Sequence, residues 1–93
     1  MRSAPTKAER AHLARIKNLS CGLCNASPPS SAHHIRTGHG MGQKASDWLA
    51  IPLCYSCHQG GNGIHGDRAM WKVMGKNELD VLAETIARLM QNG

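Results

Sequence analysis

The 93-residue sequence contains no phenylalanine, and aromatic residues make up only 3 % of it. The core must therefore be built mainly from Leu, Ile, Met and Ala side chains and two tryptophans. A chain this short buries proportionally little surface, and small domains commonly need a metal ion or disulfide bonds for stability. We expect such a cross-link in a single domain of residues 1–93, with residues 1–5 as a flexible tail.

Long hydrophobic runs are also missing. No apolar stretch approaches the ~18 residues of a membrane-spanning helix, and residues 1–10 lack the hydrophobic core of a signal peptide. We therefore expect a cytoplasmic protein with no membrane association. In a reducing compartment, cysteines serve more often as metal ligands than as disulfide partners.

Acidic residues are few: six Asp and Glu stand against eleven Lys and Arg, which gives a formal net charge of +5. A basic balance favours a polyanionic partner, nucleic acid first and an anionic membrane surface second. A solvated surface that keeps a small protein soluble explains the same charge. Charge alone leaves both interpretations open.

The apolar periodicity and the turn residues predict an α+β domain. We expect a helix over residues 6–19, strands over residues 32–36 and 48–53, and helices over residues 67–73 and 77–90.

Caps and apolar stripes support three of these elements. Thr6 and Glu9 have the spacing of a capping box, Gly75 ends a helix, and Asn77 can cap the last one. Four side chains with helical spacing are expected in the core: Leu79, Leu82, Ile86 and Leu89. Trp48 and Trp71 could stack on bases, but both are expected to fill the core instead.

The cysteines form two Cys-x-x-Cys pairs, called here the first knuckle (Cys21, Cys24) and the second knuckle (Cys54, Cys57), with 29 residues between them. Two-residue spacing lets both sulfurs of a knuckle face one ion, so the four thiolates predict a closed tetrahedral zinc site of structural type. Two local disulfides would close tiny loops of little stabilising effect. A thioredoxin-like redox pair would need a βαβ pattern that the sequence lacks.

Histidines form a second group: His12, His33, His34, His39, His58 and His65. His33 and His34 are adjacent in a predicted strand, so they should point to opposite faces and do different work. His58 directly follows the second knuckle, and His65 lies in a glycine-rich segment before a predicted helix. His12 has an ordinary helical explanation, and a substrate contact is the less favoured interpretation of His39.

Together these motifs resemble the HNH endonuclease superfamily, whose ββα-metal domain places a β-hairpin and a helix around one catalytic metal. The resemblance runs through both knuckles, His33-His34-Ile35, Pro52-Leu53-Cys54 and Ile64-His65. It is closer to the Ref family of phage RecA-dependent nucleases, through His33-His34-Ile35-Arg36-x-Gly38-x-Gly40, Gly60 to Gly66 and Trp71, and it covers about residues 8–90.

Two departures from those families are visible. Ref proteins carry a long basic region before this core, whereas about 20 residues precede Cys21 here. The middle Asn of the HNH motif has no counterpart before Cys54, and Asp47 is the nearest polar candidate for holding that loop.

The resemblance implies a role for four of the six histidines. His33, His58 and His65 would bind one divalent cation, and His34 would be the general base that deprotonates water. The cation would polarise the phosphate and stabilise the leaving oxygen, and magnesium, manganese and zinc all remain open. Four cationic side chains are candidates for contacts to the DNA backbone: Arg36, Lys44, Arg68 and Lys72.

The leading hypothesis is thus a metal-dependent DNA endonuclease, with RecA as a candidate partner and a bacterial host cell and a phage or prophage origin implied by the resemblance. The alternative is a non-catalytic, zinc-stabilised nucleic-acid-binding module, which explains the charge and the knuckles but not the histidines. A protein-interaction domain that docks on a recombinase filament is a third interpretation.

Overall fold

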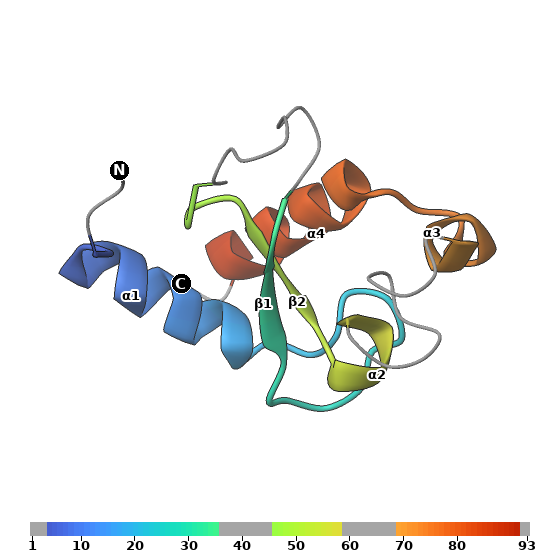
Figure 1. Ribbon diagram of the computed structural model, residues 1–93, viewed down its shortest axis with the longest axis horizontal. Coiled ribbons are helices and arrows are strands. Elements are labelled where there is room, and N and C mark those ends of the chain that lie inside the picture. Colours follow the sequence, from blue (N-terminus) through green and yellow to red (C-terminus); the bar gives the residue numbers. More distant parts are fainter. Residues whose placement is uncertain (1–3, 36–45, 59–68, 92–93) are drawn as a thin grey trace.

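The computed structural model describes residues 4–35, 46–58 and 69–91, and it is a small mixed domain of helices and strands (Figure 1). In chain order the elements are α1 (Lys7–Lys17), β1 (Ser31–His34), β2 (Ala50–Leu53), α2 (Tyr55–His58), α3 (Ala69–Met74) and α4 (Glu78–Gln91). The mixture of helices and strands agrees with the expected class.

The two strands form an antiparallel pair in which His33 lies opposite Ile51 and His34 opposite Ala50. The second strand is shorter than predicted because Trp48 and Leu49 belong to a turn. Their backbone amides donate to Ser46, from Trp48 N to Oγ at 3.2 Å and from Leu49 N to the carbonyl oxygen at 3.1 Å. The first strand begins one residue earlier than predicted and ends at His34.

Both predicted helix caps are confirmed. Thr6 Oγ1 accepts from the Glu9 amide, and Glu9 accepts from the Thr6 amide, which completes the capping box of α1. Asn77 and Asp80 make the same reciprocal pair at α4, at 2.9 and 3.0 Å. Gly75 ends α3 as expected, with a φ of 69° that favours glycine.

The predicted core face of α4 is confirmed for Leu82, which packs against the core, and is wrong for Leu79 and Ile86. Leu79 and Ile86 are 51 % and 49 % exposed, whereas Val81 and Thr85 are buried. Leu82 and Leu89 are half-buried. Hydrophobic spacing alone admits neighbouring faces of one helix, and the packing of Val81 in the main core decides between them.

The core is aliphatic and lies around the hairpin. Its members are buried to below a tenth of their surface: Ile16, Cys21, Leu23, Ile35, Ala50, Ile51, Leu53, Cys57 and Val81. Every residue of β2 is buried, because α1 and α4 both pack on this strand (Figure 1). Trp71 packs against this core as predicted, but the prediction for Trp48 is wrong, since it is 48 % exposed.

The first knuckle is held between β2 and α4. The Gly22 amide donates to the Pro52 carbonyl oxygen at 2.8 Å, and a Cβ at Gly22 would lie 2.5 Å from Cγ1 of Val81. Arg88 of α4 also donates to the Ser20 carbonyl and hydroxyl oxygens. The close approach requires glycine at this position, and it anchors the knuckle to the core. Among the described residues, no helix has the length and apolar character to cross a membrane.

Candidate metal centre and histidine site

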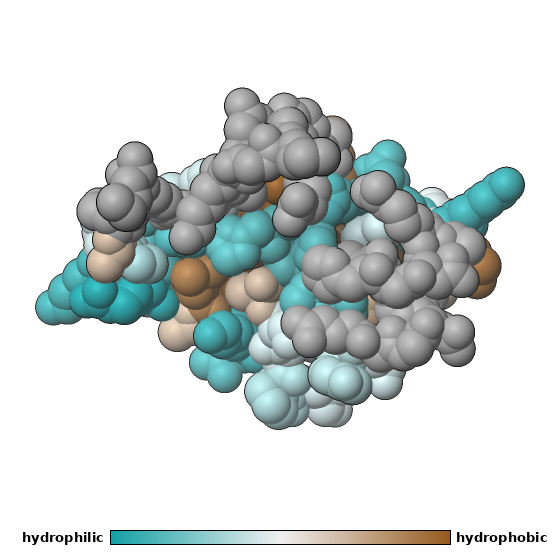
Figure 2. Space-filling model, viewed as in Figure 1, coloured by the Kyte–Doolittle hydropathy of each residue, from teal (hydrophilic) through white to brown (hydrophobic). Residues whose placement is uncertain are grey.

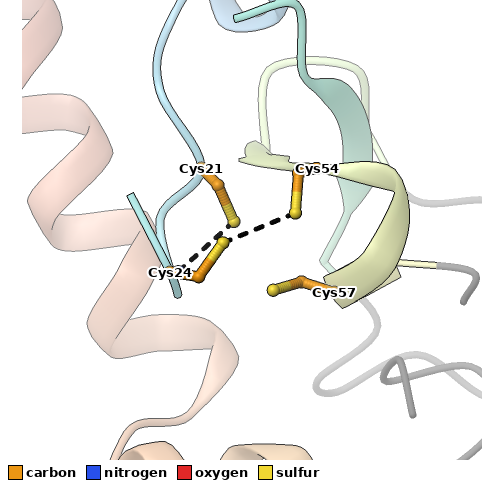
Figure 3. Close-up of side chains that lie close together, drawn as sticks. All are labelled: Cys21, Cys24, Cys54 and Cys57. Atoms are coloured by element: carbon orange, nitrogen blue, oxygen red, sulfur yellow. Dashed lines mark hydrogen bonds between the residues drawn. The ribbon is translucent and has the colours of Figure 1, made fainter. Parts of the chain in front are cut away.

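The four cysteines converge on one point, as Figure 3 shows, although they come from two distant parts of the chain. Their sulfur atoms all lie within 4.8 Å of one another, and Cys24 Sγ lies 3.5 Å from Cys54 Sγ. A tetrahedral zinc ion with Zn–S bonds of ~2.3 Å would place its sulfurs about 3.8 Å apart. All four are free cysteines. The cluster therefore fits a structural metal such as zinc and does not form the two local disulfides.

Local backbone geometry builds each knuckle. The Cys21 amide donates to the Ala26 carbonyl oxygen at 2.9 Å and the Asn25 amide to that of Cys21 at 3.0 Å, so the chain folds back after the first pair. Asn25 has a φ of 66°, which asparagine tolerates better than most residues. In the second knuckle, α2 begins directly after Cys54, and one helical turn brings Cys57 back beside it.

Hydrogen bonds and burial shift the pKa values of Cys21 and Cys57 in opposite directions. Burial opposes ionisation of Cys21, but backbone amides around its sulfur lower its pKa to about 7. Burial, followed by the neighbouring thiols, raises the pKa of Cys57 well above its usual range. Four adjacent thiols resist simultaneous ionisation, and a bound cation is the usual means of stabilising all four thiolates.

His33 is one of two β1 histidines that pair with a carboxylate. Its Nε2 lies 2.6 Å from Oε2 of Glu78, the first residue of α4, and both side chains are buried. Because the carboxylate only accepts, the imidazole donates from Nε2, and the neutral ring then carries its lone pair on Nδ1. Glu78 therefore sets the tautomer and orientation of His33.

His34 is held in the same manner by a different residue. Its Nε2 lies 2.7 Å from Oδ1 of Asp47, which precedes β2 and is buried. The His34 side chain itself is 36 % exposed. The Nε2–H tautomer leaves the Nδ1 lone pair as the basic atom of a partly solvated ring. The adjacent histidines thus have separate carboxylate partners and different burial, as strand alternation predicts.

His58 lies against His33. It ends α2, is 7 % exposed, and its ring makes an edge-to-face contact with that of His33 at a centroid distance of 5.1 Å. The second knuckle therefore connects the cysteine cluster to the histidines through one residue, since Cys57 and His58 are consecutive.

Most of the other residues considered for the site fall outside the described part of the chain. His65, Arg36, Lys44, Arg68 and His39 lie outside the described residues. Lys72 is exposed on α3. Within the described ranges, the four cysteines are the group of three or more potential ligands close enough to hold an ion. The histidine site is thus described in part.

Sequence reasoning missed Glu78 as a partner of His33, because the two residues are separated by 45 positions and no motif joins them. A carboxylate in the first turn of α4 has a local explanation, since it also interacts favourably with the helix dipole. Asp47 was singled out as the polar candidate for holding the loop before Cys54, and the structure shows that its carboxylate accepts from His34.

Comparison with known proteins adds a family but no activity. The profile of the family described as "Protein of unknown function (DUF968)" matches residues 4–93. The chain is 31 % identical over 81 residues to "Uncharacterized protein YdfU" of Escherichia coli (strain K12), covering 84 % of this chain and 22 % of that protein. It thus spans about a fifth of the length of this relative. No solved structure matches the chain.

Proposed function

We propose that this chain, which belongs to the DUF968 family, is a metal-dependent DNA endonuclease of the HNH type. The observation that carries the proposal is the pairing of two adjacent β1 histidines with separate buried carboxylates, His33 with Glu78 and His34 with Asp47. Such pairs orient imidazoles for metal binding and for proton transfer. A module that only binds nucleic acid has no need of them.

His34 is the general base in this proposal. Its donation from Nε2 to Asp47 leaves Nδ1 to accept a proton from water, and its partial exposure gives water access. Asp47 then stabilises the imidazolium that forms, as a carboxylate behind a catalytic histidine does.

His33 and His58 are the described ligands that we propose for a divalent cation. The Glu78–His33 pair has the donor arrangement of a carboxylate–histidine–metal triad, in which the second ring nitrogen donates to the carboxylate. His58 supplies a second imidazole beside it, and His65 is the expected third. When bound, the cation would polarise the phosphate and stabilise the leaving oxygen.

We propose contacts to the DNA backbone for the exposed Lys72. On charge alone, the same role is proposed for Arg36, Lys44 and Arg68. The basic net charge supports binding that is salt-dependent and largely independent of sequence. RecA stays a candidate partner through the resemblance to the Ref family.

The test is a cleavage assay on supercoiled plasmid and circular single-stranded DNA, with magnesium, manganese or no added metal, and with or without RecA and ATP. Metal-dependent nicking supports the endonuclease, and a RecA requirement would place it beside the Ref proteins. DNA binding without cleavage in every lane would instead favour the zinc-stabilised binding module, which the cysteine cluster and the charge support equally well.

Asp47→Asn is expected to slow cleavage by roughly tenfold or more, but less than loss of His34, because it disturbs only part of a general-base contribution of ~10²–10⁴. The amide can donate as well as accept, so it no longer selects the His34 tautomer. The loss should fall on kcat rather than KM in steady-state assays, and Asp47→Glu should recover part of it. Unchanged kcat with lowered thermal stability would make Asp47 a structural residue only.

Glu78→Gln is expected to weaken binding of the activating cation about 10- to 100-fold, as loss of such outer carboxylates typically does. The affinity for the cation is measured by titrating manganese in the cleavage assay and by calorimetric titration of manganese into the protein. Excess manganese should restore the cleavage rate. Glu84→Gln is the matched control, since Glu84 lies on the same helix and is paired with Lys76. Identical titration curves for both variants would remove Glu78 from the site.

A further inference from the structure

Trp48 is a large aromatic side chain on the surface of a protein that has very few. It is 48 % exposed, although it precedes the wholly buried strand β2. An indole that fills a core would lose most of this exposure. Its position is thus not explained by packing alone, and the open part of the ring is available to a ligand.

The ring packs against a neighbour on one side, and its backbone is fixed by hydrogen bonds. On one side it contacts the His12 imidazole of α1, with centroids 5.0 Å apart and planes tilted by 43°. Its backbone is set by the turn at Ser46, whose hydroxyl accepts from the Trp48 amide. The segment before β2, green in Figure 1, accordingly lies on the α1 side of the hairpin. A braced ring loses little freedom when a planar ligand stacks on it.

The helix that contacts Trp48 has the charge that attracts a polyanion. Helix α1, which supplies His12, carries four exposed cationic side chains and a single acidic one, Glu9. The cationic residues are Lys7, Arg10, Arg15 and Lys17. Figure 2 shows a largely hydrophilic surface at the α1 end of the molecule. Aromatic rings together with cationic side chains are the usual composition of a protein that binds single-stranded nucleic acid.

Trp48 also adjoins the proposed catalytic pair. It directly follows Asp47, whose carboxylate accepts from His34. Consecutive Cα atoms lie ~3.8 Å apart, so the backbone of Trp48 lies beside that of Asp47. Leu49, the next residue, is also partly exposed, at 37 %.

We infer that Trp48, braced by His12, stacks on an unpaired base of single-stranded DNA beside the phosphate attacked by the water that His34 would deprotonate. A base inside a duplex is already stacked on its neighbours, so an exposed protein ring selects strands whose bases are free. This inference rests on the proposed function only for the position of the scissile phosphate. Stacking itself is a binding property and is tested without cleavage.

The experiment measures binding of dye-labelled oligothymidylate and of an abasic oligonucleotide of equal length by anisotropy, without added divalent cation. Wild-type protein should bind the thymidylate more tightly than the abasic strand. Trp48→Ala should weaken thymidylate binding about 5- to 100-fold and leave abasic binding unchanged. Trp48→Tyr should retain most of the affinity. Tyr55→Ala, which removes an exposed ring from α2, is the matched control and should bind as wild type does.

Equal wild-type affinity for the two oligonucleotides, or unchanged affinity in Trp48→Ala, would overturn the inference. So would a variant that weakens both oligonucleotides alike. If Trp48→Ala does not fold, tryptophan fluorescence of a Trp71→Phe protein decides, since Trp48 is then the single tryptophan and thymidylate, but not the abasic strand, should quench it. Trp48-dependent binding without any cleavage would support the stacking inference and reject the proposed nuclease activity. Cleavage of single-stranded DNA at full efficiency by Trp48→Ala would support the nuclease activity and reject the stacking inference.

Discussion

Cys57→Ser is expected to abolish zinc binding and unfold the domain. The Cys57 sulfur is one of four that converge, and its side chain is also part of the aliphatic core. Structural zinc sites contribute ~10–16 kcal/mol of apparent binding free energy, whereas a small domain is stable by about 5–15 kcal/mol in total. Loss of the ion therefore removes most of the free energy of folding. Elemental analysis for zinc and a thermal melt followed by circular dichroism measure both consequences.

The control for this variant is Ser56→Ala, in the same turn of α2 but exposed. It should bind one zinc ion per chain and melt as wild type does. Chelation of zinc from wild-type protein should reproduce the Cys57→Ser spectrum, and zinc should reverse it. A Cys57→Ser protein that keeps a full complement of zinc and its melting temperature would disprove the four-sulfur site.

His34→Ala is expected to lower the rate of DNA cleavage by ~10²–10⁴, the usual contribution of a general base. The side chain is 36 % exposed, and its partner is the Asp47 carboxylate, so its removal leaves the main core intact. Zinc content and DNA affinity should therefore stay near the wild-type values. Initial rates of plasmid nicking with magnesium or manganese measure the loss.

Chemical rescue distinguishes the loss of the general base from a structural disruption of the active site. Added imidazole should restore part of the rate to His34→Ala, because the space left by the side chain can admit a free base. It should do nothing for Glu78→Gln, where the expected defect lies in cation binding. Full activity of His34→Ala, or a loss accompanied by loss of zinc, would reject His34 as the base.

Local chemistry could be predicted from the sequence where its determinants are a few residues apart. The capping boxes at Thr6 and Asn77 depend on side chains three residues away. The strands were located but their limits were not, because the Ser46 turn takes Trp48 and Leu49 out of β2 through hydrogen bonds that no periodicity encodes. Leu79 and Ile86 of α4 were wrongly expected in the core for a related reason, since they have the same helical spacing as buried residues.

By itself the sequence determined that four cysteines in two knuckles would converge into one cluster that could hold a metal ion, because Cys-x-x-Cys spacing directs both sulfurs of a pair to one point. It also determined that His33 and His34 would have different surroundings, because a strand alternates its side chains. Only the tertiary structure decided which groups surround them. Glu78 contacts His33 across 45 residues, and Trp48 contacts His12 of α1. Such contacts depend on how helices pack on the hairpin, which is a property of the whole core and of no single segment.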